Sequence, residues 1–234
     1  MSLSVSTPAD KPICGIRAVI IDLDGTMLHT AQDLHAAVNR MRSDLSLAPL
    51  AIDTVISFVG KGIENLVRRA LGVDFSPVVI ERHFLQALTL FEKHYLDVNG
   101  EFATVFPGVH EGLQAMQAKG LRLACVTNKP AAFTLPLMKK TGLHDYFEII
   151  YSGDSFAKKK PDPMQLLQVC AHFGLAPVEV IAIGDSISDT QAARAAGCKV
   201  LTVPYGYNHG QAVQDIDSDG IVSSLLQAAH LIST

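Results

Sequence analysis

The sequence predicts an α/β protein with a doubly wound, Rossmann-like parallel sheet core and an inserted all-helical cap domain. Two observations predict this fold class. Strand patterns alternate with helical patterns after residue 104, which is typical of a parallel sheet covered on both faces. Residues 29–103, in contrast, show only the helical spacing of apolar side chains. We therefore expect a core of residues 1–28 and 104–234, with residues 29–103 as the cap.

The first strand is expected over about residues 17–24 and ends in polar side chains. Its apolar run leads directly into Asp22, Asp24 and Gly25. Ligands of parallel sheets bind beyond the carboxyl ends of the strands, and alternate residues of an extended strand share one face. Two adjacent carboxylates repel each other unless a cation neutralises them, and Mg²⁺ bound to carboxylates and phosphate is a natural candidate. A simple Asp-Gly turn is the alternative.

The cap prediction depends on three helical segments after the first strand. Apolar residues recur at helical spacing over residues 31–47, 63–71 and 79–95. Strand patterns are missing from residue 30 to about residue 100, although one crossover between parallel strands needs only one helix. A separate cap over the strand ends is therefore favoured over helices that form the sheet's own crossover.

The remainder of the core is expected to alternate regularly. Pro130 marks the start of one helix, and Gly142 follows its end. The predicted strands are 121–127, 148–151, 179–183 and 199–203. The predicted helices are 109–118, 130–141, 164–173, 188–196 and 221–231. Residues 1–12 are polar and are expected to form a flexible tail.

Polar groups also occur at three later points of the core. Thr127 and Asn128 follow a buried strand, where both can donate hydrogen bonds to phosphate oxygens. Lys160 precedes a proline that stiffens its loop, and its ammonium group could neutralise a phosphoryl group and a carboxylate. Asp185 and Asp189 follow another apolar strand, where Asp185 could complete a metal site. Each segment alone could also be an ordinary turn.

Taken in order, the four segments resemble the four motifs of the haloacid dehalogenase-like hydrolases, and the resemblance covers nearly the whole chain. It implies that Asp22 attacks phosphorus and that its side chain also binds Mg²⁺. It implies that Asp24 is the general acid and later the general base, with its backbone carbonyl on the metal. Thr127 and Lys160 would hold phosphate, and Asp185 would bind Mg²⁺. The remaining expected site residues are Asp189, which would orient Lys160 or a metal-bound water, and Gly25, Thr26 and Asn128, which would contact substrate.

Further segments resemble the bacterial phosphoglycolate phosphatase family within these hydrolases. They include the cap stretch 59–62 and the core stretches 106–109, 152–155 and 205–208. This likeness implies 2-phosphoglycolate as the substrate, with Lys61 and Gly62 as cap candidates for its carboxylate. The residues after Thr26 depart from the usual family pattern at the entry to the cap, which bears on the substrate and not on phosphoryl transfer.

Four other functions, three of them enzymatic, are alternatives for a chain with this pattern. A capped phosphatase for a sugar phosphate would use the same catalytic residues. A phosphomutase of the β-phosphoglucomutase type would also keep Asp22 and Asp24, but it would return phosphate to sugar. A haloacid dehalogenase needs neither Mg²⁺ nor the second carboxylate, so Asp24 argues against it. A non-catalytic binding module is disfavoured because all four motif residues are present.

Composition limits the partners of the chain. The 234 residues carry a net charge of −4, and the predicted pI of about 6.1 gives no general support for a nucleic-acid partner. The sequence shows no membrane segment, and its four cysteines are widely spaced, which favours a reducing compartment. We therefore expect a cytoplasmic protein. The resemblance implies a small phosphorylated metabolite as its partner, and we expect a monomer or homodimer.

Overall fold

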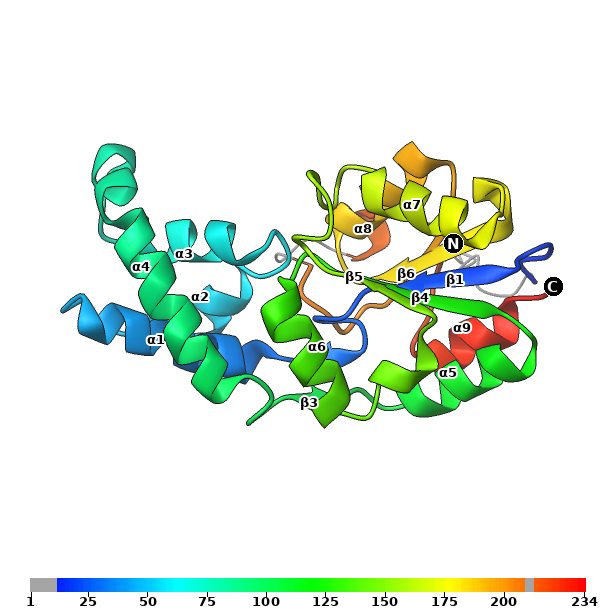
Figure 1. Cartoon of the computed structure of the whole chain (residues 1–234), viewed down its shortest axis with the longest axis horizontal. Coiled ribbons are helices and arrows are strands. Elements are labelled where there is room, and N and C mark those ends of the chain that lie inside the picture. The colour runs from blue at the N-terminus through cyan, green and yellow to red at the C-terminus, as the bar shows by residue number, and fades with distance from the viewer. Residues whose placement is uncertain (1–11, 209–212) are drawn as a thin grey trace, which may run out of the picture.

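The computed structural model describes residues 12–208 and 213–234 (Figure 1). Residues 1–11 of the expected tail lie outside the described residues. The sheet has six parallel strands in the order β5-β4-β1-β6-β7-β8, so the fold class is confirmed. Its strands are β1 (Ala18–Ile21), β4 (Arg122–Val126), β5 (Ile149–Tyr151), β6 (Val180–Gly184), β7 (Lys199–Thr202) and β8 (Gly220–Ile221).

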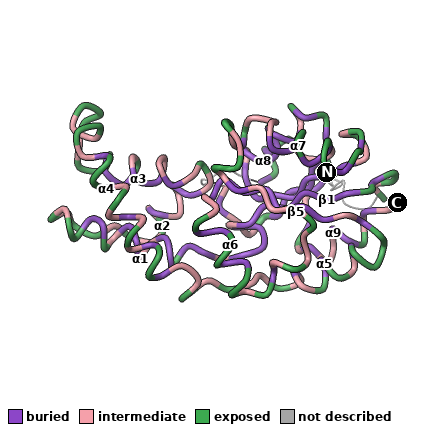
Figure 2. Tube along the Cα trace, in the orientation of Figure 1, coloured by how far each residue is buried: buried purple, intermediate pink, exposed green. Residues whose placement is uncertain are grey.

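Helices cover both faces of this sheet because its strands are apolar on both sides. Val19 and Ile21 of β1 face one hydrophobic cluster, whereas Ala18 and Ile20 face another. The first cluster includes α5 (Val109–Ala118), α6 (Ala131–Lys140) and α9 (Leu225–Leu231), and the second includes α7 (Met164–Phe173) and α8 (Ile187–Ala196). Figure 2 shows the buried strands between these helices. Burial on both faces thus fixes β1 in the middle of the core.

Four further helices gather at one end of the molecule, beyond the carboxyl ends of the strands (Figure 1). They are α1 (Ala31–Asp44), α2 (Ile52–Ile56), α3 (Ile63–Leu71) and α4 (Pro77–Val98). Their apolar faces form a third hydrophobic cluster, which Phe133 and Tyr207 of the sheet-bearing part also join. We call α1–α4 the helical unit.

Two short segments connect the helical unit to the sheet. β2 (Leu28–His29) and β3 (Thr104–Val105) pair in an antiparallel two-stranded ribbon. The buried Asp33 of α1 accepts hydrogen bonds from the backbone N–H groups of Gly100, at 2.7 Å, and Phe102, at 2.8 Å. Asp33 thereby holds the segment between α4 and β3 against the start of α1.

The expected elements mostly agree with the structure, with differences at their ends. The expected helix over residues 221–231 is wrong at its start, because residues 220–221 form β8 beside β7 and the helix begins at Leu225. Ser224 explains that start, since its hydroxyl accepts a hydrogen bond from the N–H of Gln227 at 3.1 Å. The first strand ends at Ile21, three residues earlier than expected. Across the described residues, all helices are too short or too polar to span a bilayer.

Candidate active site

Three predicted site residues lie at one edge of the sheet because each directly follows a parallel strand. Asp22 follows β1, Thr127 follows β4 and Asp185 follows β6. β4 and β6 are the two neighbours of β1. Parallel neighbours end at the same edge, so residues more than 100 positions apart in sequence come together.

Lys160 lies in the loop before α7 and reaches beneath this edge. Its Nζ donates hydrogen bonds to Asp22 Oδ1 at 2.7 Å, to Asp189 Oδ1 at 2.6 Å and to the carbonyl oxygen of Val126 at 2.8 Å. Burial alone would lower the pKa of Lys160, but the two carboxylates outweigh it and the pKa is raised. Lys160 is therefore a buried, charged ammonium group with all three protons engaged.

Asp185 is oriented by groups from two other segments. Its carboxylate accepts hydrogen bonds from the backbone N–H of Tyr207 and from the hydroxyl of Thr26, the latter at 3.3 Å. Gly25 and Gly206 press against the same side chain, so a Cβ atom at either position would collide with Asp185. Gly25 also has a positive φ of 88°, a conformation that glycine adopts without strain. The two glycines thus allow the backbone to close around the carboxylate.

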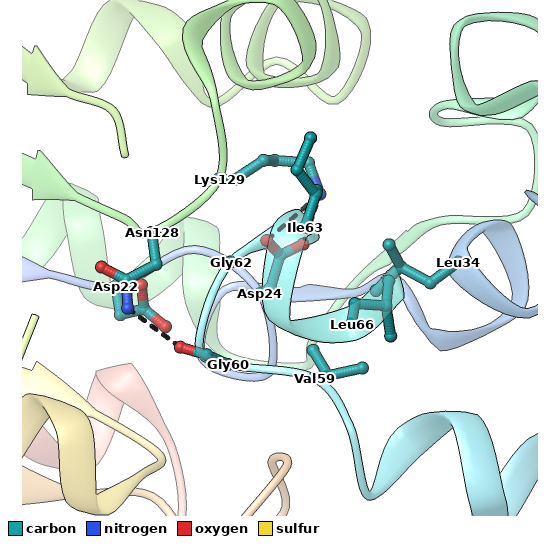
Figure 3. Close-up of a pocket in the computed structure, with 10 residues that line it drawn as sticks. All are labelled: Asp22, Asp24, Leu34, Val59, Gly60, Gly62, Ile63, Leu66, Asn128 and Lys129. Atoms are coloured by element: carbon teal, nitrogen blue, oxygen red, sulfur yellow. Dashed lines mark hydrogen bonds and ion pairs between the residues drawn. The ribbon is translucent and has the colours of Figure 1, made fainter. Parts of the chain in front are cut away.

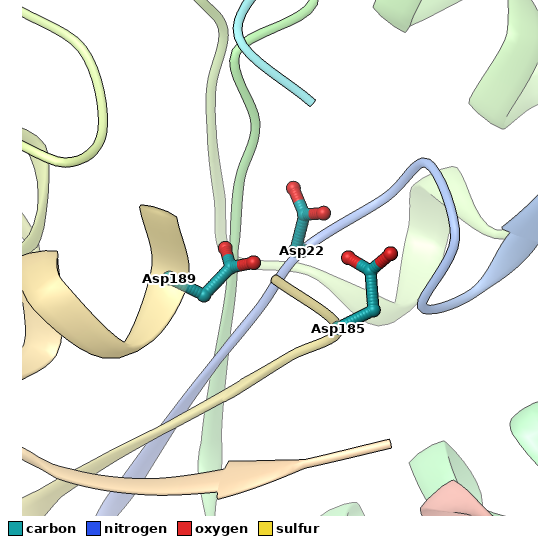
Figure 4. A group of neighbouring side chains, drawn as sticks. All are labelled: Asp22, Asp185 and Asp189. Atoms are coloured by element: carbon teal, nitrogen blue, oxygen red, sulfur yellow. The ribbon is translucent and has the colours of Figure 1, made fainter. Parts of the chain in front are cut away.

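The site contains a carboxylate cluster suited to a divalent cation. Oxygens of Asp22, Asp185 and Asp189 lie within 4.8 Å of one another (Figure 4). Burial raises the pKa of Asp22 to about 7 against the attraction of Lys160, and burial with the neighbouring acids raises the pKa of Asp185. Asp189 is less available to bind a cation, because Ser186 donates two hydrogen bonds to its Oδ2. Asp22 and Asp185 are therefore the better donors for a hard cation.

These pKa shifts predict a pH-dependent effect of metal on stability. Asp22 and Asp185 bind protons more tightly in the folded than in the unfolded chain, so the metal-free protein loses stability as pH rises from about 4 towards 7. A bound cation replaces those protons. We expect Mg²⁺ to raise the melting temperature more at about pH 8 than at about pH 5, relative to chelator. Equal Mg²⁺ effects at both pH values in calorimetry would contradict this assignment.

Asp24 turns away from the carboxylate cluster and faces the helical unit. Lys129 Nζ lies 2.9 Å and 3.1 Å from its two carboxylate oxygens, and the hydroxyl of Thr30 donates a hydrogen bond to Oδ1 at 2.6 Å. Asp22, Asp24 and Lys129 line one cavity of about 40 Å³ (Figure 3). The helical unit contributes the apolar side chains Leu34, Val59, Ile63 and Leu66 to the same cavity.

The predicted phosphate-binding pair occupies the sheet side of this site. Thr127 is buried, and its hydroxyl accepts a hydrogen bond from the N–H of Lys129 at 3.2 Å. Asn128 lines the cavity and donates to the carbonyl oxygens of Gly60, at 3.0 Å, and Lys160, at 2.8 Å. Asn128 thus ties the helical unit to the loop that carries Lys160.

The two expected substrate contacts in the helical unit differ in position. Gly62 lines the cavity and is the N-cap residue directly before α3, with a positive φ of 87°. Lys61 is exposed and is not among the described residues that line the cavity. Its role in binding a substrate carboxylate stays a prediction.

Sequence reasoning missed the groups that hold Asp24 in place. Lys129 follows Thr127 and Asn128 directly, so its position after a functional strand end was an available signal. Thr30 and Tyr95 carried no such signal, because they reach the site through the packing of α1 and α4 and not through a strand end.

Comparisons with known proteins agree with this architecture. Residues 19–203 match the family model described as haloacid dehalogenase-like hydrolase. The phosphoglycolate phosphatases of Thiobacillus denitrificans and Nitrosospira multiformis are 48% and 50% identical to this chain, and in each case the match covers 93% of this chain and 96% of the relative. A crystal structure described as a predicted phosphoglycolate phosphatase from Haemophilus somnus superposes with a TM-score of 0.87 at 28% identity, covering 93% of this chain and 98% of that one.

The chain belongs to the haloacid dehalogenase-like hydrolase family, and its fold and strand-end site agree with that family. Within that family it is similar to the phosphoglycolate phosphatases over nearly its whole length. It is therefore a phosphoglycolate phosphatase-like enzyme of the phosphoric monoester hydrolase class.

Proposed function

We propose that the protein is a Mg²⁺-dependent phosphomonoester hydrolase whose nucleophile is Asp22. The observation that carries this proposal is the contact of 2.7 Å between Lys160 Nζ and Asp22 Oδ1. It places a buried cation beside a carboxylate that lines a small cavity. A carboxylate can approach an anionic phosphate only where positive charge offsets their repulsion.

In the first half of the reaction, an oxygen of Asp22 attacks phosphorus in line with the leaving alcohol. The new bond to Asp22 forms as the bond from phosphorus to the alcohol oxygen breaks. Asp24 donates a proton to that oxygen, so that a neutral alcohol leaves. The product on the enzyme is an aspartyl-phosphate.

In the second half, Asp24 is the base. It accepts a proton from a water molecule whose oxygen attacks phosphorus, and the bond to Asp22 breaks. Inorganic phosphate leaves, and Asp24 regains the proton that it gave to the alcohol. The sum of the two steps is one phosphate ester and one water converted to one alcohol and one phosphate.

The carboxylates of Asp22 and Asp185 and the backbone carbonyl of Asp24 would hold Mg²⁺, with Asp189 in support through Lys160. When bound, the ion would supply positive charge that lowers the repulsion between nucleophile and phosphate. Thr127, Lys160, Gly25, Thr26 and Asn128 would surround the phosphate. The buried contact between Asp189 and Lys160, at 2.6 Å, supports this division of roles.

We further propose 2-phosphoglycolate as the substrate and residues 29–103 as a cap that sets specificity. The side chains of Leu34, Val59 and Leu66 line the cavity beside Asp22 and Asp24, so the helical unit would contact a substrate bound there. The relatives named phosphoglycolate phosphatase support this choice of substrate. Lys61 and Gly62 are the cap candidates for contact with the carboxylate. A cytoplasmic location remains our inference from four free cysteines.

The test is phosphate release from a panel of esters in the presence of Mg²⁺ or a chelator. We expect kcat/KM for 2-phosphoglycolate to exceed that for glucose 6-phosphate by about 100-fold or more, and chelation to abolish both activities. Higher kcat/KM with a sugar phosphate would refute the substrate. Transfer of phosphate between sugar positions without release would instead indicate a phosphomutase.

A further inference from the structure

A buried chain of polar groups connects the helical unit to Asp24. Lys129 Nζ donates to both carboxylate oxygens of Asp24 and to the hydroxyl of Tyr95. The Lys129 side chain is only 3% exposed, and that of Asp24 is 13% exposed. Tyr95 is fully buried. A hydrogen-bonded chain in such surroundings is expected to hold one geometry, since unpaired buried polar groups are costly.

Tyr95 is a rigid anchor for this chain. It lies in α4, and its ring packs against Phe91 at 5.3 Å and against Phe133 of α6 at 4.8 Å between centroids. Burial raises the pKa of the Tyr95 hydroxyl, so it stays neutral and can accept a hydrogen bond. The Lys129 ammonium group also lies 4.8 Å from the centre of the ring. Contacts to Tyr95 of the helical unit and to Asp24 of the core thus fix the position of the Lys129 ammonium group.

The two lysines of the site contact different acids. Lys160 contacts Asp22 and Asp189, whereas Lys129 contacts Asp24. Burial would lower the pKa of Lys129, but Asp24 and Tyr95 outweigh it, so the group remains charged. The nucleophile Asp22 and the proton donor Asp24 are therefore held by different cations. Of the two ammonium groups, that of Lys129 donates a hydrogen bond to the helical unit.

We propose that Lys129 and Tyr95 are positioning residues that orient Asp24 for proton transfer to the leaving alcohol. Tyr95 acts through Lys129, and the helical unit thereby controls the acid as well as enclosing the substrate. This inference rests on the proposed role of Asp24. It adds that the correct position of Asp24 depends on the hydroxyl group of Tyr95 in α4.

The proposal predicts different losses of kcat/KM for substrates with different leaving groups. An alcohol needs a proton from Asp24 as its bond to phosphorus breaks, whereas acetate from acetyl phosphate leaves without one. The value of kcat/KM reports the steps up to the first irreversible one, which under initial-rate conditions is release of the leaving group after phosphoryl transfer to Asp22. Loss of positioning should therefore lower kcat/KM for 2-phosphoglycolate and leave kcat/KM for acetyl phosphate nearly unchanged.

The experiment compares Tyr95→Phe, Lys129→Met and the double variant on both substrates in Mg²⁺. We expect kcat/KM for 2-phosphoglycolate to fall about tenfold in Tyr95→Phe and about 100-fold in Lys129→Met, with changes below about threefold for acetyl phosphate. Because Tyr95 acts through Lys129, the double variant should resemble Lys129→Met within about twofold. Tyr146→Phe, which removes a hydroxyl that contacts His110 and Gln114, is the matched control and should behave as wild type.

Equal losses on both substrates would overturn the proposal, as would independent losses that multiply in the double variant. Equal losses would show a general structural role, and losses that multiply would show that Tyr95 does not act through Lys129. If Lys129→Met does not fold, as judged by thermal unfolding, Tyr95→Phe decides alone by the same comparison of substrates. Failure of the proposed function is recognised separately, because Asp22→Asn would then retain activity or the wild type would not hydrolyse 2-phosphoglycolate.

Discussion

Asp22→Asn is expected to abolish phosphate release, with a loss in kcat of at least about 10⁴-fold. The amide has no charged oxygen with which to attack phosphorus. The variant should nevertheless fold, because the amide has the size of the carboxylate and its oxygen can still accept a hydrogen bond from Lys160. Lys160 also keeps a second carboxylate partner in Asp189, at 2.6 Å. The measurements are phosphate release from 2-phosphoglycolate and thermal unfolding of the same preparation.

The matched control for this variant is Asp145→Asn. The Asp145 side chain is 99% exposed and contacts only His144 among the described ion pairs. Its replacement should leave turnover unchanged. A folded Asp22→Asn protein with more than about one hundredth of wild-type kcat would exclude Asp22 as the nucleophile.

Lys160→Met is expected to have the second-largest effect, lowering kcat about 10³-fold. The side chain is 5% exposed and contacts Asp22 and Asp189. Its removal leaves these two acids facing each other and takes from the phosphate the positive charge of the Lys160 ammonium group. Stability should also fall by about 3–5 kcal/mol, because a buried ion pair loses one partner. Both quantities are measured on the same variant, with kinetics recorded below its melting temperature.

Lys158→Met provides the control in the same loop. Lys158 is 63% exposed and pairs with Asp162, so we expect no change in kcat and little change in stability. If Lys160→Met retained wild-type kcat while Lys158→Met lost it, the phosphate would bind on the outer side of the loop. That outcome would contradict the arrangement proposed for the site.

The principal elements of the fold were predictable because long apolar patterns carry their own periodicity. The central strand β1 is clear from its continuous apolar run, and the long helix α4 is clear from the helical spacing of its apolar residues. The two-residue strands β2, β3 and β8 were not predicted, since two residues cannot show a period of two. The five-residue helix α2 is also too short for a helical pattern. Such elements depend on their neighbours and not on their own sequence.

The site was predictable where it depends on strand ends and was missed where it depends on packing. Asp22, Thr127 and Asp185 each follow a strand, and neighbouring strands must end together. The contact between Lys129 and Tyr95 requires knowledge of how α4 packs over the sheet. The expectation that Asp22 and Asp24 share one side assumed an extended strand, but β1 ends at Ile21 and the two acids have different partners.

The most direct test of the central claim identifies the atom that receives the phosphoryl group. Wild-type protein turning over radiolabelled 2-phosphoglycolate would be quenched in acid, digested and mapped. We predict label on the peptide that contains Asp22, release of that label by hydroxylamine as from an acyl phosphate, and no label in Asp22→Asn. Continued turnover with no labelled peptide, or with the label on another residue, would contradict the account.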